Sequence, residues 1–241
     1  MTGRCFRTWL PVLASCFWAG GVGLSPFPAS AASAGLAVVI ANEYEGFLPG
    51  ATRDATAIAD KLEASGFAAV RLLGATGDAI AAGIEQIRKA AEGAGPRRIV
   101  YLSGFGMCLN DDLVLFADDM QPEQYESGQV GDVAIPLSVV VEAVAAGGDQ
   151  TLVVFDTSPN QCTEDGLKAI KLPEKTALLV TTGIGGDVVD EIEEGGKSAF
   201  ATAFLQEFAS DRAVKDVVDK VIEQIKVLTE EQQVPVLIGK L

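Results

Sequence analysis

The chain carries cysteine, serine and carboxylate side chains in its loops, but none of its 241 residues is a histidine. Histidine is the usual general base of serine and cysteine hydrolases and a common metal ligand. Its absence excludes Ser-His-Asp catalysis, Cys-His catalysis and any metal site built on imidazole. A nucleophile in this chain would need a different base.

The best candidate nucleophile is Ser158, which lies in a loop that follows a strongly apolar run. A serine hydroxyl reacts only when a base lies beside it, and the nearest lysine in sequence is Lys168. Because Ser158 precedes Pro159, it is also typical of a plain turn. We favour the turn over catalysis.

Carboxylates gather in two places. Asp118 and Asp119 follow a short apolar run, and Asp187 and Asp190 belong to an acidic stretch that continues through residues 191–194. Such oxygen ligands suit Ca²⁺, but the spacing of an EF-hand loop is absent. We therefore expect no cofactor, with calcium as the alternative, and an acidic surface that attracts basic peptides or proteins.

Apolar runs alternate with amphipathic stretches along the chain, which predicts an α/β fold with a mainly parallel sheet and helices on both faces. In such a fold the functional loops follow the carboxyl ends of the strands. The predicted strands are 35–42, 68–73, 98–103, 151–156, 177–182 and 234–239, with a short strand at 113–117. The predicted helices are 52–65, a helix capped by Thr76, and 137–146, 198–210 and 213–230.

Residues 1–34 have the order of a secretory signal: two arginines, an apolar run over 9–24, and small-residue motifs at 29–31 and 32–34. We expect cleavage after position 31 or 34, which leaves one domain over 35–241 in the periplasm or the medium. The apolar run is short and interrupted by proline and glycine, so no transmembrane span is expected after cleavage. The alternative is a lipoprotein attached through Cys16, because Leu13-Ala14-Ser15-Cys16 resembles a lipobox.

The charge of the chain excludes some classes of binding partner. It has 18 basic and 33 acidic residues, a formal charge of −15, and loss of residues 1–34 removes two arginines and no acid, giving −17. Such a charge repels phosphate backbones, so no nucleic-acid partner is expected. Anionic membrane surfaces are disfavoured for the same reason.

Two strand-end motifs carry a family resemblance: Ser103-Gly104-Phe105-Gly106 and Asp156-Thr157-Ser158. With them the chain resembles the caspase-like cysteine peptidases of family C14, in particular the bacterial metacaspase and orthocaspase branch. The resemblance covers nearly the whole chain after the leader and implies a caspase-hemoglobinase-like sandwich whose six-stranded sheet ends in an antiparallel strand. Further similar segments are Val39–Asn42 with Tyr44, Asp54-Ala55, Gly66-Phe67, Leu115–Asp118, Gly196–Phe200 and Gln233–Pro235.

The departures from the family pattern bear on function. The family has Ser-Gly-His-Gly, whose histidine is the base, and Asp-x-Cys, whose cysteine is the nucleophile. Phe105 stands at the histidine position and Ser158 at the cysteine position. Because Phe105 cannot take a proton, this pattern predicts a protein without the catalytic dyad.

The resemblance also assigns roles to three other residues. Asp156 matches an acidic residue that helps form a pocket for Arg or Lys side chains, although capping of the following turn explains it equally well. Cys108 and Cys162 follow the two dyad loops, which are neighbours in this fold, so a disulfide between them is predicted. The alternatives are two free thiols, or Cys162 as a displaced nucleophile that also lacks a base.

The sequence therefore predicts an exported caspase-like pseudopeptidase that binds a peptide or protein partner around Asp156, Ser158, Phe105 and the acidic stretch 187–194. The alternative is an active endopeptidase of the same family with an unorthodox nucleophile and a preference for basic residues. A third reading is a regulatory module that acts only through its acidic surface.

Overall fold

The computed structural model describes residues 33–121, 123–124, 131–157, 159, 161–183, 188, 192 and 196–241. The predicted signal peptide and the lipobox cysteine lie outside the described residues. The strands are β1 (Gly35–Ala41), β2 (Phe67–Leu73), β3 (Arg97–Ser103), β4 (Gly106–Leu109), β5 (Asp112–Phe116), β6 (Ala134–Pro136), β7 (Gln150–Asp156), β8 (Thr176–Val180) and β9 (Val236–Gly239). The helices are α1 (Ala51–Ala64), α2 (Gly77–Gly93), α4 (Leu137–Val144), α5 (Glu164–Ala169), α6 (Ala199–Glu207) and α7 (Val214–Leu228).

The main sheet has six strands in the order β2-β1-β3-β7-β8-β9. Neighbouring strands from β2 to β8 run parallel, and β9 pairs with β8 antiparallel. The predicted six-stranded, mainly parallel sheet with a final antiparallel strand is therefore confirmed. The central strands β1, β3, β7 and β8 are almost wholly buried because both faces of the sheet are covered.

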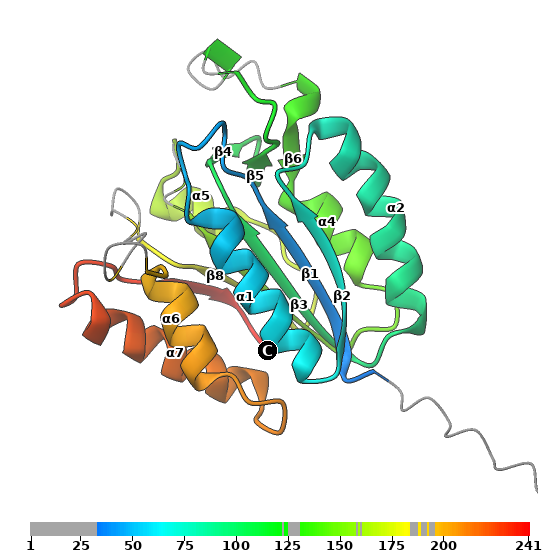
Figure 1. Ribbon diagram of the computed structural model, residues 1–241, viewed down its shortest axis with the longest axis vertical. Coiled ribbons are helices and arrows are strands. Elements are labelled where there is room, and N and C mark those ends of the chain that lie inside the picture. The colour runs from blue at the N-terminus through cyan, green and yellow to red at the C-terminus, as the bar shows by residue number, and fades with distance from the viewer. Residues whose placement is uncertain are drawn as a thin grey trace, which may run out of the picture. The chain divides into compact units, whose positions relative to one another are not determined.

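Helices cover both faces of this sheet (Figure 1). Helices α1, α6 and α7 lie on one face, where their apolar residues pack with those of β1 and β3. Helices α2 and α4 lie on the other face. Among the described residues no helix is both long and apolar enough to cross a membrane.

The first described residues, Ser33 and Ala34, lie at the amino ends of the strands and form hydrogen bonds there. The Ala34 N–H donates to Gly66 O at 2.8 Å, and the Gly95 N–H donates to Ser33 Oγ at 3.1 Å. The Arg97 guanidinium donates to Ala34 O through Nε at 3.4 Å. Ser33 and Ala34 are thus bonded to the folded domain.

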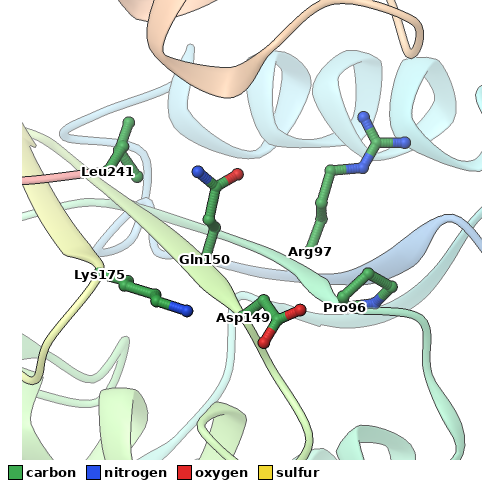
Figure 2. A pocket seen from close by; sticks show the side chains of 6 residues that line it. All are labelled: Pro96, Arg97, Asp149, Gln150, Lys175 and Leu241. Carbon is green, nitrogen blue, oxygen red and sulfur yellow. The ribbon is translucent and has the colours of Figure 1, made fainter.

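A hollow of about 440 Å³ opens at the same end of the sheet (Figure 2). The Arg97 guanidinium at the edge of this hollow already has partners within the protein. It donates to Ser210 O at 2.7 Å and lies 5.0 Å from the centre of the Phe67 ring. This hollow lies at the opposite end of the strands from the loops that the sequence singled out. Its lining residues are Pro96, Arg97, Asp149, Gln150, Lys175 and Leu241.

Arg98, the next residue on β3, is completely buried. Its guanidinium donates to Val144 O at 2.8 Å and Ala146 O at 2.6 Å, at the end of α4, and to Ala91 O at 3.1 Å in the last turn of α2. It also donates to Gly95 O and Arg97 O. The guanidinium thus places a positive charge at the carboxyl ends of two helices, where a cation is favourable. Burial lowers the pKa of Arg98 from its ordinary value.

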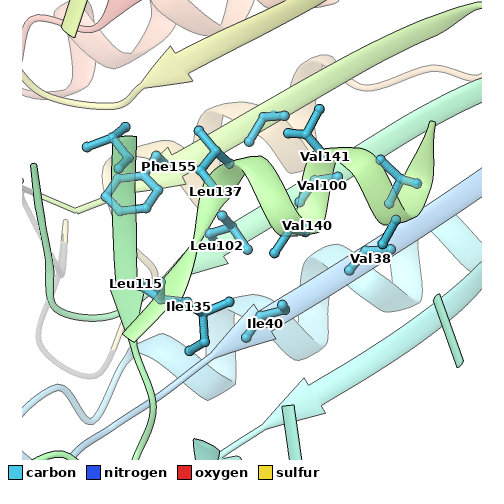
Figure 3. Packing of buried hydrophobic residues seen from close by; sticks show 14 of the residues in the cluster. Val38, Ile40, Val100, Leu102, Leu115, Ile135, Leu137, Val140, Val141 and Phe155 are labelled. Carbon is cyan, nitrogen blue, oxygen red and sulfur yellow. The ribbon is translucent and has the colours of Figure 1, made fainter. Parts of the chain in front are cut away.

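The core on the α2 and α4 face joins the sheet to a second, smaller sheet (Figure 3). Val38, Ile40 and Val100 from the main sheet pack in one cluster with Leu115 of β5 and Leu137 of α4. The second sheet has three antiparallel strands in the order β4-β5-β6. It extends the fold beyond the carboxyl ends of the main strands.

Three of these elements, β4, β6 and α5, are not predicted from the sequence. Only the β5 region was predicted as a strand, because β4 and β6 are four and three residues long. Helix α5 has six residues, too few to show a helical repeat, although Thr163 caps it by accepting from Gly166 N. The last strand begins at Val236 rather than at position 234.

Candidate functional site

The two loops that the sequence singled out start from neighbouring strands. The register pairs Ser103 at the end of β3 with Asp156 at the end of β7, and Phe155 with Val180 at the end of β8. Phe105, two residues after β3, and Asp156, the last residue of β7, therefore belong to adjacent strand ends, as predicted. Ser158, Asp187 and Asp190 lie outside the described residues.

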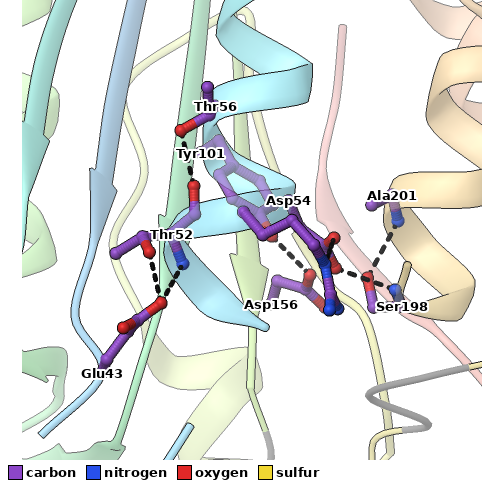
Figure 4. Close-up of polar contacts among 9 residues, drawn as sticks. Glu43, Thr52, Asp54, Thr56, Tyr101, Asp156, Ser198 and Ala201 are labelled. Atoms are coloured by element: carbon purple, nitrogen blue, oxygen red, sulfur yellow. Dashed lines mark hydrogen bonds and ion pairs between the residues drawn. The ribbon is translucent and has the colours of Figure 1, made fainter. Parts of the chain in front are cut away.

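The Asp156 carboxylate is buried and bonded within the fold. Tyr101 donates its hydroxyl to Oδ2 at 2.7 Å (Figure 4). Thr181 donates its hydroxyl to Oδ1 at 2.7 Å. The side chains come from β3, β7 and the residue after β8, so one carboxylate ties together three adjacent strands.

The buried position of Tyr101 beside Asp156 changes the pKa of its hydroxyl. Burial, followed by the charge of Asp156 and the hydrogen bond to it, raises the pKa of Tyr101 well above its usual value. The folded protein therefore keeps this proton at a pH where the unfolded chain has lost it. The stability that Tyr101 provides is complete below about pH 10 and is lost as the pH rises above that value.

We expect the Tyr101→Phe variant to lose less stability at alkaline pH than the unmodified protein. The difference in slope should approach about 1.4 kcal/mol per pH unit above pH 10 for one retained proton. Urea unfolding at several pH values between 9 and 11 measures it. Equal slopes for the two proteins would contradict the shift. At neutral pH the variant should be less stable by about 1 kcal/mol through the lost hydrogen bond.

A second buried carboxylate joins the helices on the same face. Asp54, in the first turn of α1, accepts from the Ser198 N–H at 2.8 Å, and Ser198 caps α6 by accepting from the Ala201 N–H at 3.1 Å (Figure 4). The Nε atom of Arg53 lies 3.3 Å from Asp54 Oδ1. Phe200, two residues after Ser198, stacks on the Tyr101 ring with centroids 5.6 Å apart. The Gly196–Phe200 motif is thus the start of a helix that packs against the site.

Phe105 is held by an aromatic neighbour. Its ring lies 4.6 Å from the ring of Tyr44, centroid to centroid, and its N–H donates to the Tyr44 hydroxyl at 2.9 Å. The same hydroxyl donates to Phe116 O at 2.8 Å. Gly104 has a φ of +149°, and a Cβ atom there would come within 2.6 Å of that hydroxyl. The glycine is required by this close approach.

The loop that carries Tyr44 depends on Asp118. The Asp118 carboxylate accepts from the Glu43 N–H at 2.8 Å and the Tyr44 N–H at 2.9 Å through the same oxygen. Tyr44 and Glu45 have φ values of 51° and 55°, which are unfavourable for residues with a Cβ atom. Asp118 therefore stabilises a strained loop backbone.

Asp119, the other calcium candidate in this region, also binds backbone, because its Oδ1 accepts from the Gly77 N–H at 3.0 Å. Within the ranges that the structure describes, no group of three or more Cys, Asp or Glu side chains is arranged to hold a metal ion.

Cys108 and Cys162 form a disulfide, as predicted, with 5.0 Å between their Cα atoms. Cys108 lies on β4, which follows Phe105, and Cys162 lies between β7 and α5. The bridge closes a segment 54 residues long. In the chain-entropy description, closing a loop of that length stabilises the folded state by roughly 4 kcal/mol.

Tyr101 and Thr181 are not predicted as site residues from the sequence, and Tyr44 is identified there only as part of a family motif. Tyr101 reads as one more apolar residue of a buried strand, since no local pattern shows that its hydroxyl meets a carboxylate 55 residues away. Thr181 directly follows β8 on the strand adjacent to β7, so strand order would have identified it once the sheet was known.

The strand order, the antiparallel last strand and the loops at the carboxyl ends define an α/β protein with a caspase-like fold. The family model of the caspase domain, peptidase family C14, matches residues 34–241. The chain belongs to this family. A search among curated proteins gave no match.

Proposed function

We propose that this protein is an exported caspase-domain protein that lacks the His/Cys dyad and binds a peptide or protein partner at the carboxyl ends of the strands. The main support for the proposal is the identity and packing of Phe105. The Phe105 ring packs on Tyr44 and its backbone is bonded to the Tyr44 hydroxyl, so the loop after β3 presents an aromatic side chain where the family has its base.

The charge supports a basic partner. The chain has a formal charge of −15, and the buried Asp156 carboxylate lies at the same strand ends as Phe105. An acidic protein steers basic peptides toward itself, and a buried carboxylate adds attraction at short range. No metal or other cofactor is part of the proposal.

We expect no peptidase activity above buffer from the purified mature protein. The substrates are peptides ending in Arg or Lys, tested with and without calcium, beside a Ser158→Ala control. Turnover that disappears in the Ser158→Ala variant would overturn the proposal and establish the active endopeptidase. Turnover that appears only with calcium would show a metal-dependent enzyme.

The same peptides, when labelled and not cleaved, test binding. We expect fluorescence anisotropy to show binding that weakens with added salt, as an acidic surface requires. A variant with its 187–194 acids neutralised separates binding at the strand ends from binding by the acidic surface. Retained affinity in that variant supports the strand ends, and complete loss supports a module that acts through its acidic surface.

Export is proposed from the leader sequence, with release preferred to attachment as a lipoprotein through Cys16. Among the two cleavage points, the contacts of Ser33 and Ala34 with Gly66, Gly95 and Arg97 favour cleavage after Ala31, because cleavage after Ala34 would remove them. We expect amino-terminal sequencing of the exported protein to begin at Ala32. A sequence that begins at Gly35 would contradict this, and a diacylglycerol-modified Cys16 would establish the lipoprotein.

A further inference from the structure

The segment between β7 and β8 is joined to the rest of the domain in an unusual way. Within Gln161–Glu174, all of which the structure describes, every hydrogen bond has both partners inside the segment. Leu167 N–H donates to Thr163 O, and Lys168 forms an ion pair with Glu164. No backbone ladder or polar side chain therefore fastens this segment to the sheet.

Two kinds of contact hold the segment in place. One is apolar packing, in which the buried side chains of Leu167 and Ile170 and the half-buried Leu172 join the core cluster on the α4 face. The other is the Cys108–Cys162 bridge to β4. Helix α5, with six residues, is far too short to be stable by itself.

The apolar packing is also incomplete. A cavity of about 210 Å³ lies between α4 and residues 170–173, lined by Leu137 and Val141 on one side and by Ile170 and Leu172 on the other. The cavity is partly open to solvent and is also lined by the exposed Ser138, Glu142 and Lys171, so the apolar side chains at this contact are not packed on all sides. The bridge therefore carries a large share of the attachment of this segment.

We infer that the Cys108–Cys162 disulfide is a redox clamp, and that its reduction releases Gln161–Glu174 as a unit while the six-stranded sheet stays folded. Local unfolding of a unit with few contacts is the expected behaviour when its main restraint is removed. Release uncovers the apolar face of α4 at Leu137 and Val141. The inference does not depend on the proposed function.

The chemistry is thiol–disulfide exchange with a dithiol reductant. Cys108 is half-buried whereas Cys162 is 8% exposed, so attack falls on Cys108 Sγ. A reductant thiolate forms a mixed disulfide with Cys108 and expels Cys162 as a thiolate, which takes a proton. The second reductant thiolate then displaces Cys108. The bridge gains two electrons and two protons, and the dithiol becomes a disulfide.

Hydrogen exchange measured by mass spectrometry on the mature protein, with and without dithiothreitol, tests the clamp. We expect exchange over 161–174 to rise at least tenfold on reduction, while β1, β3 and β7 keep their protection. The Cys108→Ser/Cys162→Ser variant should show the same local rise without reductant. Unchanged exchange over 161–174 would overturn the inference, and so would an equal rise across the sheet, which would make the bridge a staple of the whole fold.

Limited trypsin digestion gives a second measurement on the same protein. Lys168 and Lys171 lie in the segment, and Lys89 on α2 is a matched exposed control. We expect rapid cleavage at Lys168 or Lys171 only after reduction, with Lys89 resistant in both states. Cleavage at Lys168 or Lys171 at the same rate in the oxidised protein would show that the bridge does not hold the segment.

Discussion

Replacing Arg98 with methionine should destabilise the protein by about 4 kcal/mol, the largest effect of any single substitution that we predict. Methionine fills much of the space of the arginine stem but offers no donor. The carbonyl groups of Val144 and Ala146 would lose the guanidinium donor, and Ala91 O would keep only the Ala94 N–H. Both helix ends would also lose the cation that faces them. Each buried carbonyl left without a donor costs about 1–3 kcal/mol.

The Arg98→Lys variant separates charge from geometry. An ammonium group keeps the positive charge but cannot place donors in the planar fork that reaches both α2 and α4. We expect about half of the loss, roughly 2 kcal/mol. Urea unfolding of the oxidised protein measures both variants. Arg88→Met on the exposed face of α2 is the control and should stay within about 0.5 kcal/mol. A loss below about 1 kcal/mol in Arg98→Met would show that water replaces the guanidinium at the helix ends.

Arg98 also shows where sequence reasoning stops. The sequence places Arg98 at the start of a predicted strand, where a charged residue usually faces solvent. Its burial depends on the ends of α2 and α4 meeting beside β3, which is a tertiary arrangement. The central strands β1, β3, β7 and β8 could be predicted because two-sided burial gives each one an apolar run that is readable without knowledge of its neighbours.

The small sheet and the site were less predictable. The β4–β5 hairpin turns at Asn110-Asp111, with φ values of 50° and 61°, and Asn and Asp are among the residue types that tolerate such values in a tight hairpin. The turn residues are visible in the sequence, but β4 and β5 have only four and five residues, so the hairpin was not predicted. In the site, Asp156 and Phe105 came from strand-end motifs, whereas the bonds of Asp156 to Tyr101 and Thr181 required the strand order.

Replacing Asp156 with alanine should cost about 3 kcal/mol of unfolding free energy, because two buried hydroxyls lose their acceptor at once. Asp156→Asn keeps one acceptor oxygen and nearly the same volume, so about 1–2 kcal/mol is expected. Asp149→Asn, an exposed carboxylate just before the other end of β7, is the control and should change stability by less than about 0.5 kcal/mol. Urea unfolding at pH 7 ranks the three. Equal losses in Asp156→Asn and Asp149→Asn would show that the hydroxyl bonds contribute little.

The asparagine variant also decides what Asp156 does for a partner, since it removes the charge and leaves the fold largely intact. If the carboxylate attracts basic side chains, Asp156→Asn should bind a labelled Arg-ended peptide at least tenfold more weakly, and Asp149→Asn should bind it normally. An unchanged affinity in Asp156→Asn would assign Asp156 to the structure alone, because its two hydroxyl bonds already explain why β3, β7 and β8 end together. Peptide binding would then have to come from the acidic stretch 187–194, and Phe105 would mark a site that has lost its substrate pocket as well as its base.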